Sequence, residues 1–189
     1  MAKFTQHTIE TAPEASHAAL AGTKAAFGMV PNLQTFMAES PALINSYAQV
    51  WDIYHKQSSF NAVEQQVVLL TANFENNCEY CMSGHSFLAK GMGMDAPTLE
   101  ALRNNTKIPN ARLEALHSFT GKVVRDRGWV NEMDVDAFLV AGFTKQQVFD
   151  VIAGVALKVM SNYTNHITHT PLDGFMAETK WTKPQHAMA

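Results

Sequence analysis

The chain has 189 residues, of which 47% are hydrophobic and 16% are charged, with a formal net charge of −3. This length suits one domain with a substantial core, and so few charges lead us to expect apolar surface buried between copies of the chain. Lysine and arginine form no basic stripe, and no apolar run reaches the length of a signal-peptide core or a membrane span, so we expect a cytoplasmic protein with neither a nucleic-acid nor a membrane partner.

Apolar residues recur at helical spacing along most of the chain, and capping residues mark the helix ends. Ser40-Pro41 is an N-cap and N1 pair, and Asn61 with Glu64 and Thr144 with Gln147 form capping boxes. No stretch alternates apolar and polar residues at period two, so the sequence predicts an all-α fold. The helices are expected over residues 11–26, 32–39, 41–57, 61–74, 78–92, 95–103, 111–127, 131–142 and 144–167.

We expect a single domain over 1–189. Its parts are N-terminal helices within 11–57, a core at 60–92, C-terminal helices within 95–169 and a weakly patterned tail at 170–189. Gln65-Gln66-Val67 precedes His85 at the same offset at which Gln146-Gln147-Val148 precedes His166. Two explanations of this internal similarity remain open: the chain contains two related helical halves, or the match arose by chance.

Cys78 and Cys81 are the only cysteines of the chain, and His85 follows the second by four residues. On a helix, these three side chains lie within an arc of roughly 60°, and residues three or four apart have Cβ atoms about 5–6 Å from each other. The two cysteines can therefore form a disulfide with little backbone movement. Because cytoplasmic thiols are kept reduced, this spacing favours a redox dithiol over a structural disulfide.

The same geometry separates the roles of the two cysteines. His85 lies one turn beyond Cys81 and can take its proton, so we assign Cys81 as the attacking thiolate and Cys78 as the resolving thiol. Two alternatives remain open: His85 can instead hydrogen-bond a carbonyl between helices, and both thiols can be inert core residues. Structural zinc needs four ligands and only three lie together, so we expect no metal and no cofactor.

Glu64 has two possible roles that the sequence alone does not separate. It is the N3 residue of the Asn61 capping box, and it can also act as a buried carboxylate that orients His85. The capping role requires no assumption about tertiary contacts.

The segments Glu64-Gln65-Gln66-Val67-Val68-Leu69-Leu70 and Asn77-Cys78-Glu79-Tyr80-Cys81, followed by His85, resemble the alkylhydroperoxidase D-like branch of the carboxymuconolactone decarboxylase family. The resemblance implies an AhpD-like helical bundle that assembles as a homo-oligomer, a trimer or a hexamer. It implies an alkyl hydroperoxide reductase with Cys81 as the peroxidatic cysteine, Cys78 as the resolving cysteine and His85 as the proton-relay histidine. It also implies reduction of the disulfide by an external dithiol of the lipoyl or thioredoxin type.

The chain departs from the family pattern at one position. The relay glutamate of the family lies twelve residues before the first cysteine, where this chain has Gln66, and Glu64 lies about 200° away round the helix. The relay therefore uses His85 without a carboxylate, or Glu64 is brought in by a local shift, or the activity is weak. Two other functions stay open: a carboxymuconolactone decarboxylase-like lyase that does not need the dithiol, and a redox or metal sensor without turnover.

Overall fold

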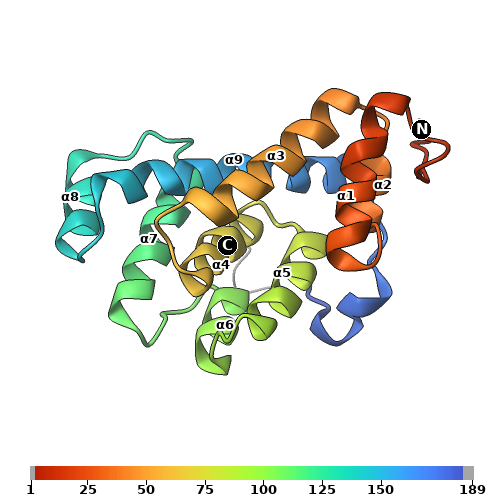
Figure 1. The fold of residues 1–189 in the computed structure, drawn as a ribbon. Coiled ribbons are helices and arrows are strands. Elements are labelled where there is room, and N and C mark those ends of the chain that lie inside the picture. The colour runs from red at the N-terminus through yellow and green to blue at the C-terminus, as the bar shows by residue number, and fades with distance from the viewer. Residues whose placement is uncertain (1–2, 185–189) are drawn as a thin grey trace.

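The computed structural model describes residues 3–184, and every regular element in that range is a helix, which confirms the all-α prediction (Figure 1). Nine α-helices and two short 3-10 helices follow one another along these residues. In chain order they are η1 (Glu14–Ser16), α1 (His17–Phe27), α2 (Asn32–Met37), α3 (Pro41–Gln57), α4 (Ala62–Glu75), α5 (Glu79–Gly91), α6 (Ala96–Asn104), α7 (Ala111–Arg125), α8 (Glu132–Val140), α9 (Lys145–Thr168) and η2 (Gly174–Thr179).

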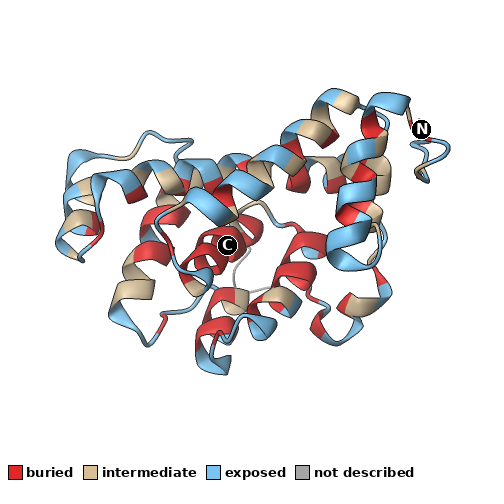
Figure 2. Cartoon of the chain, in the orientation of Figure 1, coloured by how far each residue is buried: buried red, intermediate tan, exposed pale blue. Residues whose placement is uncertain are grey.

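Helix α4 is the central element of the fold, and α5, α7 and α9 pack around it. Every residue from Glu64 to Phe74 is buried, as Figure 2 shows for the middle of the molecule. Neighbouring helices cover all sides of this helix, so its buried surface is wider than the single stripe of an amphipathic helix. Polar residues of α4 therefore find partners on those helices, as Asn73 does when its Oδ1 accepts a hydrogen bond from Asn162 at 2.9 Å.

Most helix ends lie where capping residues predict them. Ser40 accepts a hydrogen bond from the backbone of Leu43 at the start of α3, and both predicted capping boxes are present at the starts of α4 and α9. The first helix is an exception, because it begins at His17 rather than near Thr11. Thr8 N donates to Thr11 Oγ1 at 2.9 Å, so these residues form a turn before the helix.

A tight reversal joins α4 to α5. Asn77 has a left-handed backbone (φ +54°), which asparagine tolerates better than most residues, and Cys78 N donates to Asn73 O at 2.9 Å. The sequence correctly predicts a helix break at Asn76-Asn77. Its consequence is that Cys78 and Cys81 lie at the N-terminus of α5, beside the central helix.

The weakly patterned tail is part of the packed structure as far as residue 184, and residues 185–189 of the predicted tail lie outside the described residues. Trp181 is 4% exposed, packs edge-on against Phe74 and donates from Nε1 to Arg103 O at 2.8 Å. Asp173 accepts a hydrogen bond from the hydroxyl of Tyr80 and from Asn32 N. These contacts join distant segments, so no local periodicity reveals them.

Large apolar side chains are exposed along α8 and α9. They include Met133, Val140, Phe149, Ile152, Tyr163 and Ile167, with exposed fractions from 50% to 88%. Within residues 3–184, none of the helices combines the length and apolar character needed to cross a bilayer.

We expect Trp181→Ala to lower the free energy of unfolding by about 3–5 kcal/mol, because it removes a buried aromatic side chain and leaves a cavity beside Phe74. Urea unfolding followed by circular dichroism measures the loss. The matched control is Trp129→Ala, at a position 88% exposed, where a change within about 0.5 kcal/mol is expected. Equal effects of the two substitutions would contradict the packed position of the tail.

Candidate active site

The two thiols lie in the first turn of α5. Cys78 is the N-cap residue, Cys81 is the third helical residue, and both are buried free thiols. No side chain caps this helix end. The unpaired backbone N–H groups and the positive end of the helix dipole therefore lie beside the sulfurs and favour a thiolate.

A residue of α9 holds the two sulfurs together. Asn165 Nδ2 lies 3.1 Å from Cys81 Sγ and 3.7 Å from Cys78 Sγ, so one amide contacts both thiols. The neighbouring His166, which the internal similarity of the sequence singles out, is exposed, and Asn165 is the residue that contacts the cysteines.

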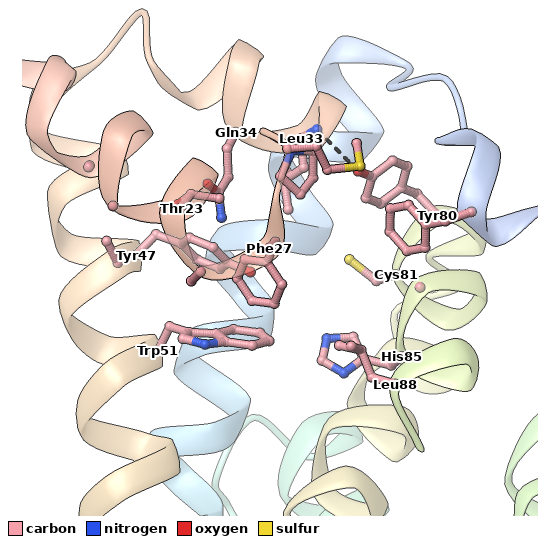
Figure 3. A pocket seen from close by; sticks show the side chains of 18 of the residues that line it. Thr23, Phe27, Leu33, Gln34, Tyr47, Trp51, Tyr80, Cys81, His85 and Leu88 are labelled. Atoms are coloured by element: carbon pink, nitrogen blue, oxygen red, sulfur yellow. Dashed lines mark hydrogen bonds between the residues drawn. The ribbon is translucent and has the colours of Figure 1, made fainter. Parts of the chain in front are cut away.

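A cavity of about 660 Å³ ends at Cys81 (Figure 3). Cys81, His85 and Lys158 contribute to its wall, whereas Cys78 is not among the described residues that line it. A molecule in the cavity therefore meets the sulfur of Cys81 first.

The rest of the cavity wall is mainly apolar and aromatic. Figure 3 shows Trp51 of α3 and Phe27 of α1 across the cavity from His85 and Cys81 of α5. Such a wall, mainly apolar with a small number of polar groups, is typical of a small-molecule site. The aromatic side chains in the wall are Phe27, Tyr47, Trp51, Tyr80, Phe87 and Phe175.

His85 is held between two side chains. Its Nδ1 lies 2.9 Å from Gln66 Oε1, and its Nε2 lies 2.9 Å from Lys158 Nζ. An amide oxygen only accepts and an ammonium only donates, so Nδ1 carries the proton and Nε2 accepts. Burial, followed by the positive charge of Lys158, lowers the pKa of His85 well below its usual value, which agrees with a neutral ring.

Lys158 is the residue that sequence reasoning missed. It is 1% exposed, and no ion pair found within residues 3–184 includes it. A signal for it was present: a lysine in the apolar middle of its helix, seven residues before Asn165 and hence on the same face. Buried lysines are rare unless they are paired, so this position calls for a partner.

The two thiols differ in acidity. Burial of Cys81 opposes its ionisation, but a hydrogen bond from the Cys78 thiol and the positive charge of Lys158, with polar side chains of α9, outweigh it and lower the pKa of Cys81 to about 5. The contact with Cys81, together with burial, raises the pKa of Cys78. At neutral pH, the site therefore holds a thiolate on Cys81 and a protonated thiol on Cys78.

Glu64 does not contact His85. Its Oε2 accepts from Asn61 N at 3.1 Å, and its Oε1 accepts from Arg112 Nε at 3.0 Å. The capping interpretation is confirmed, and an ion pair with Arg112 is added to it. Of the two residues considered as partners for His85, Gln66 is the one within hydrogen-bond distance.

In the part of the chain that the structure describes, no three His, Cys, Asp or Glu side chains gather as metal ligands would. The third residue of the predicted cluster, His85, has both nitrogens engaged by Gln66 and Lys158.

Solved structures resemble this one over nearly their whole length. An AhpD-core, peroxidase-related protein from Ralstonia eutropha JMP134 has a TM-score of 0.83 at 20% identity and covers 96% of this chain and 97% of its own. The chain has the AhpD-like fold. A peroxidase-related protein from Silicibacter sp. TM1040 has a TM-score of 0.79 at 17% identity, with 95% of each chain covered.

A third structure with the AhpD-like fold is a cysteine-to-alanine variant of the debrominase Bmp8 in complex with 2,3,4-tribromopyrrole. Its TM-score is 0.77 at 14% identity, and it covers 95% of this chain and 96% of its own. No family model and no curated protein matches the sequence. The fold expected from the CxxC resemblance is therefore confirmed by structure.

We expect iodoacetamide to alkylate Cys81 rapidly at pH 7 and Cys78 slowly. Because the pKa of Cys81 is lowered to about 5, its alkylation rate should rise between about pH 4 and 6 and then level off, whereas an ordinary thiol is still gaining reactivity near pH 8. Intact mass and peptide mapping across this range measure both rates.

Matched variants identify the reactive thiol. Cys81→Ser should lose the fast phase, and Cys78→Ser should keep it because the serine hydroxyl can still donate to the Cys81 sulfur. A fast phase that survives in Cys81→Ser would reverse the assignment.

Proposed function

We propose that this protein is a thiol-dependent reductase of organic hydroperoxides. The observation that carries the proposal is the division between the two cysteines: Cys81 lines the cavity and has a lowered pKa, whereas Cys78 does not line it and has a raised pKa. An attacking thiolate and a protonated resolving thiol are what a dithiol peroxidase needs. The AhpD-like fold of two peroxidase-related structures supports the same reaction.

The reaction has two steps. The Cys81 thiolate attacks the outer oxygen of the hydroperoxide, the O–O bond breaks, Cys81 becomes a sulfenic acid and an alkoxide leaves. The Cys78 thiol then attacks the sulfenic sulfur, so a disulfide forms and the hydroxyl leaves as water with the Cys78 proton. The two thiols supply the two electrons that reduce the peroxide to an alcohol and water.

We assign His85 to the proton relay of this reaction. Its Nε2 accepts a hydrogen bond from the ammonium group of Lys158. Gln66 accepts from Nδ1 and so fixes the tautomer in which Nε2 is free to accept. Gln66 thus accepts the hydrogen bond that a relay carboxylate would accept, although an amide cannot take up a proton.

The oxidised enzyme needs an external dithiol, which we propose to be of the thioredoxin or lipoyl type. A disulfide between Cys78 and Cys81 closes a very small loop, and such a loop adds little stability to the oxidised form. That disulfide is therefore suited to repeated reduction. The homo-oligomer stays a prediction, and the exposed apolar residues of α8 and α9 are where a second copy would bury apolar surface.

A second candidate function is the removal of halogen from an aromatic ring. The aromatic wall of the cavity suits a flat ring, and the debrominase Bmp8, with the same fold, was crystallised with a brominated pyrrole. Here the Cys81 thiolate would attack the halogen, and the electron pair of the carbon–halogen bond would stay on carbon and take a proton. Attack by Cys78 on the sulfur–halogen adduct would release halide and form the same disulfide.

We expect one equivalent of tert-butyl hydroperoxide to oxidise both thiols of the reduced protein to a single disulfide. Cys78→Ser should stop at a sulfenic acid on Cys81, which dimedone traps, and Cys81→Ser should show no fast reaction. Intact mass at timed intervals follows each species. Equal reactivity of the two variants would sink the division of roles.

Parallel incubations separate the remaining functions. Release of bromide from a bromopyrrole, with a slow peroxide reaction, would favour dehalogenation. Thiols that survive both substrates would favour a lyase, and tight zinc binding without turnover would favour a sensor.

A further inference from the structure

Lys158 is a buried positive charge at the reacting end of the cavity. It is 1% exposed, lies in the cavity wall with Cys81 and His85, and has one hydrogen-bond partner within residues 3–184, the Nε2 of His85. An ammonium group has three N–H donors, so two of them are not used by that contact. A buried ion is stable only when another charge balances it, and here that charge is the Cys81 thiolate.

The attack on a hydroperoxide moves this negative charge. When the thiolate becomes a sulfenic acid, the charge passes to the departing oxygen, which is an alkoxide in an apolar cavity. A proton must reach that oxygen at or near bond cleavage, because an unprotonated alkoxide is a poor leaving group. A group in the cavity wall must therefore supply this proton.

Of the other polar groups in the wall, Thr23 and Gln34 do not act as acids, Asp52 is exposed and paired with Lys56, and the remaining three are poorly placed or poorly suited to supply the proton. The proton of His85 is on Nδ1, where it is donated to Gln66, and its Nε2 carries none. The hydroxyl of Tyr80 donates to Asp173. Burial, with a smaller contribution from Cys81, raises the pKa of Tyr47, so that phenol can donate a hydrogen bond but gives up its proton reluctantly.

We propose that Lys158 is the catalytic acid of the site, a role that rests on the proposed hydroperoxide reduction. Its ammonium group transfers a proton to the alkoxide as the O–O bond breaks, which leaves a neutral amine and an alcohol. The charges balance: a thiolate and an ammonium before the step become a sulfenic acid and an amine after it. The buried cavity therefore holds no unpaired charge at any stage of the cycle.

The second step agrees with this role. Cys78 loses its proton when it attacks the sulfenic acid, and the neutral amine of Lys158 is a base that can carry this proton to the departing hydroxyl. The titratable groups around Lys158 are Cys81 and His85 of α5 and His55 of α3. His55 Nε2 is buried and has no hydrogen-bond partner among the described residues. Burial, together with the positive charge of Lys158, lowers the pKa of His55, which agrees with a neutral ring that adds no second charge beside Lys158.

The test compares two oxidants that attack through the same thiolate. With tert-butyl hydroperoxide the leaving group is an alkoxide that needs a proton, and with peracetic acid it is a carboxylate that does not. Single-turnover rate constants for each are measured by stopped flow on the reduced protein. Both rate constants of one variant scale with the fraction of Cys81 present as thiolate, so this fraction cancels when one is divided by the other. The ratio therefore reports the proton transfer to the leaving group.

Two substitutions separate charge from proton donation. Lys158→Arg keeps the positive charge, but a guanidinium does not give up its proton, and Lys158→Met removes both. In each variant we expect the rate with tert-butyl hydroperoxide to fall about 100-fold relative to the rate with peracetic acid, a usual contribution of general acid catalysis. The pH profile of alkylation should stay near that of the wild type in Lys158→Arg and move to higher pH in Lys158→Met.

Matched controls define the outcomes. Lys145→Met makes the same change at an exposed position of α9 and should leave both rates unchanged, and Tyr47→Phe should change their ratio by less than about tenfold. A ratio in Lys158→Met or Lys158→Arg equal to that of the wild type would overturn the acid role while leaving the peroxidase proposal intact. A wild-type protein whose thiols resist both oxidants would overturn both proposals.

Discussion

The balance between a buried ammonium and a buried thiolate is the constraint on which this site depends. Among residues 3–184, Lys158 has no carboxylate partner within ion-pair distance, and Cys81 lies in the same cavity wall. Each charge would be costly alone, and together they leave the cavity neutral. The hydrogen bond from the Cys78 thiol and the charge of Lys158 lower the pKa of Cys81, the contact with Cys81 raises the pKa of Cys78, and burial with the charge of Lys158 keeps the ring of His85 neutral.

The glutamine at position 66 makes physical sense in this setting. A glutamate there would bring a second negative charge to His85 and compete with the Cys81 thiolate for Lys158. The amide instead accepts the Nδ1 proton of His85 without adding charge, and so leaves the single positive charge to the thiolate. The departure from the family pattern and the buried lysine are therefore two parts of one arrangement.

Three helices meet to build this arrangement. The central α4 supplies Gln66, the first turns of α5 supply Cys81 and His85, and α9 supplies Lys158 and Asn165 from one face. The reversal at Asn77 sets the position of α5 against α4 and so aims the thiols at α9. Because the aromatic residues of α1 and α3 close the opposite side, the reacting sulfur lies at the end of an apolar cavity (Figure 3).

Capping residues and apolar spacing act over a few residues, so most of the helices could be predicted from the sequence, and the fixed spacing on two helices identified Cys78, Cys81, His85 and Gln66. The partner that each side chain meets depends on tertiary packing. Lys158 lies 73 residues from His85 along the chain, and no local pattern joins them. Likewise, the Arg112 contact that engages Glu64 and the packing of Trp181 depend on segments brought together by the core, where burial rather than sequence distance sets the energy.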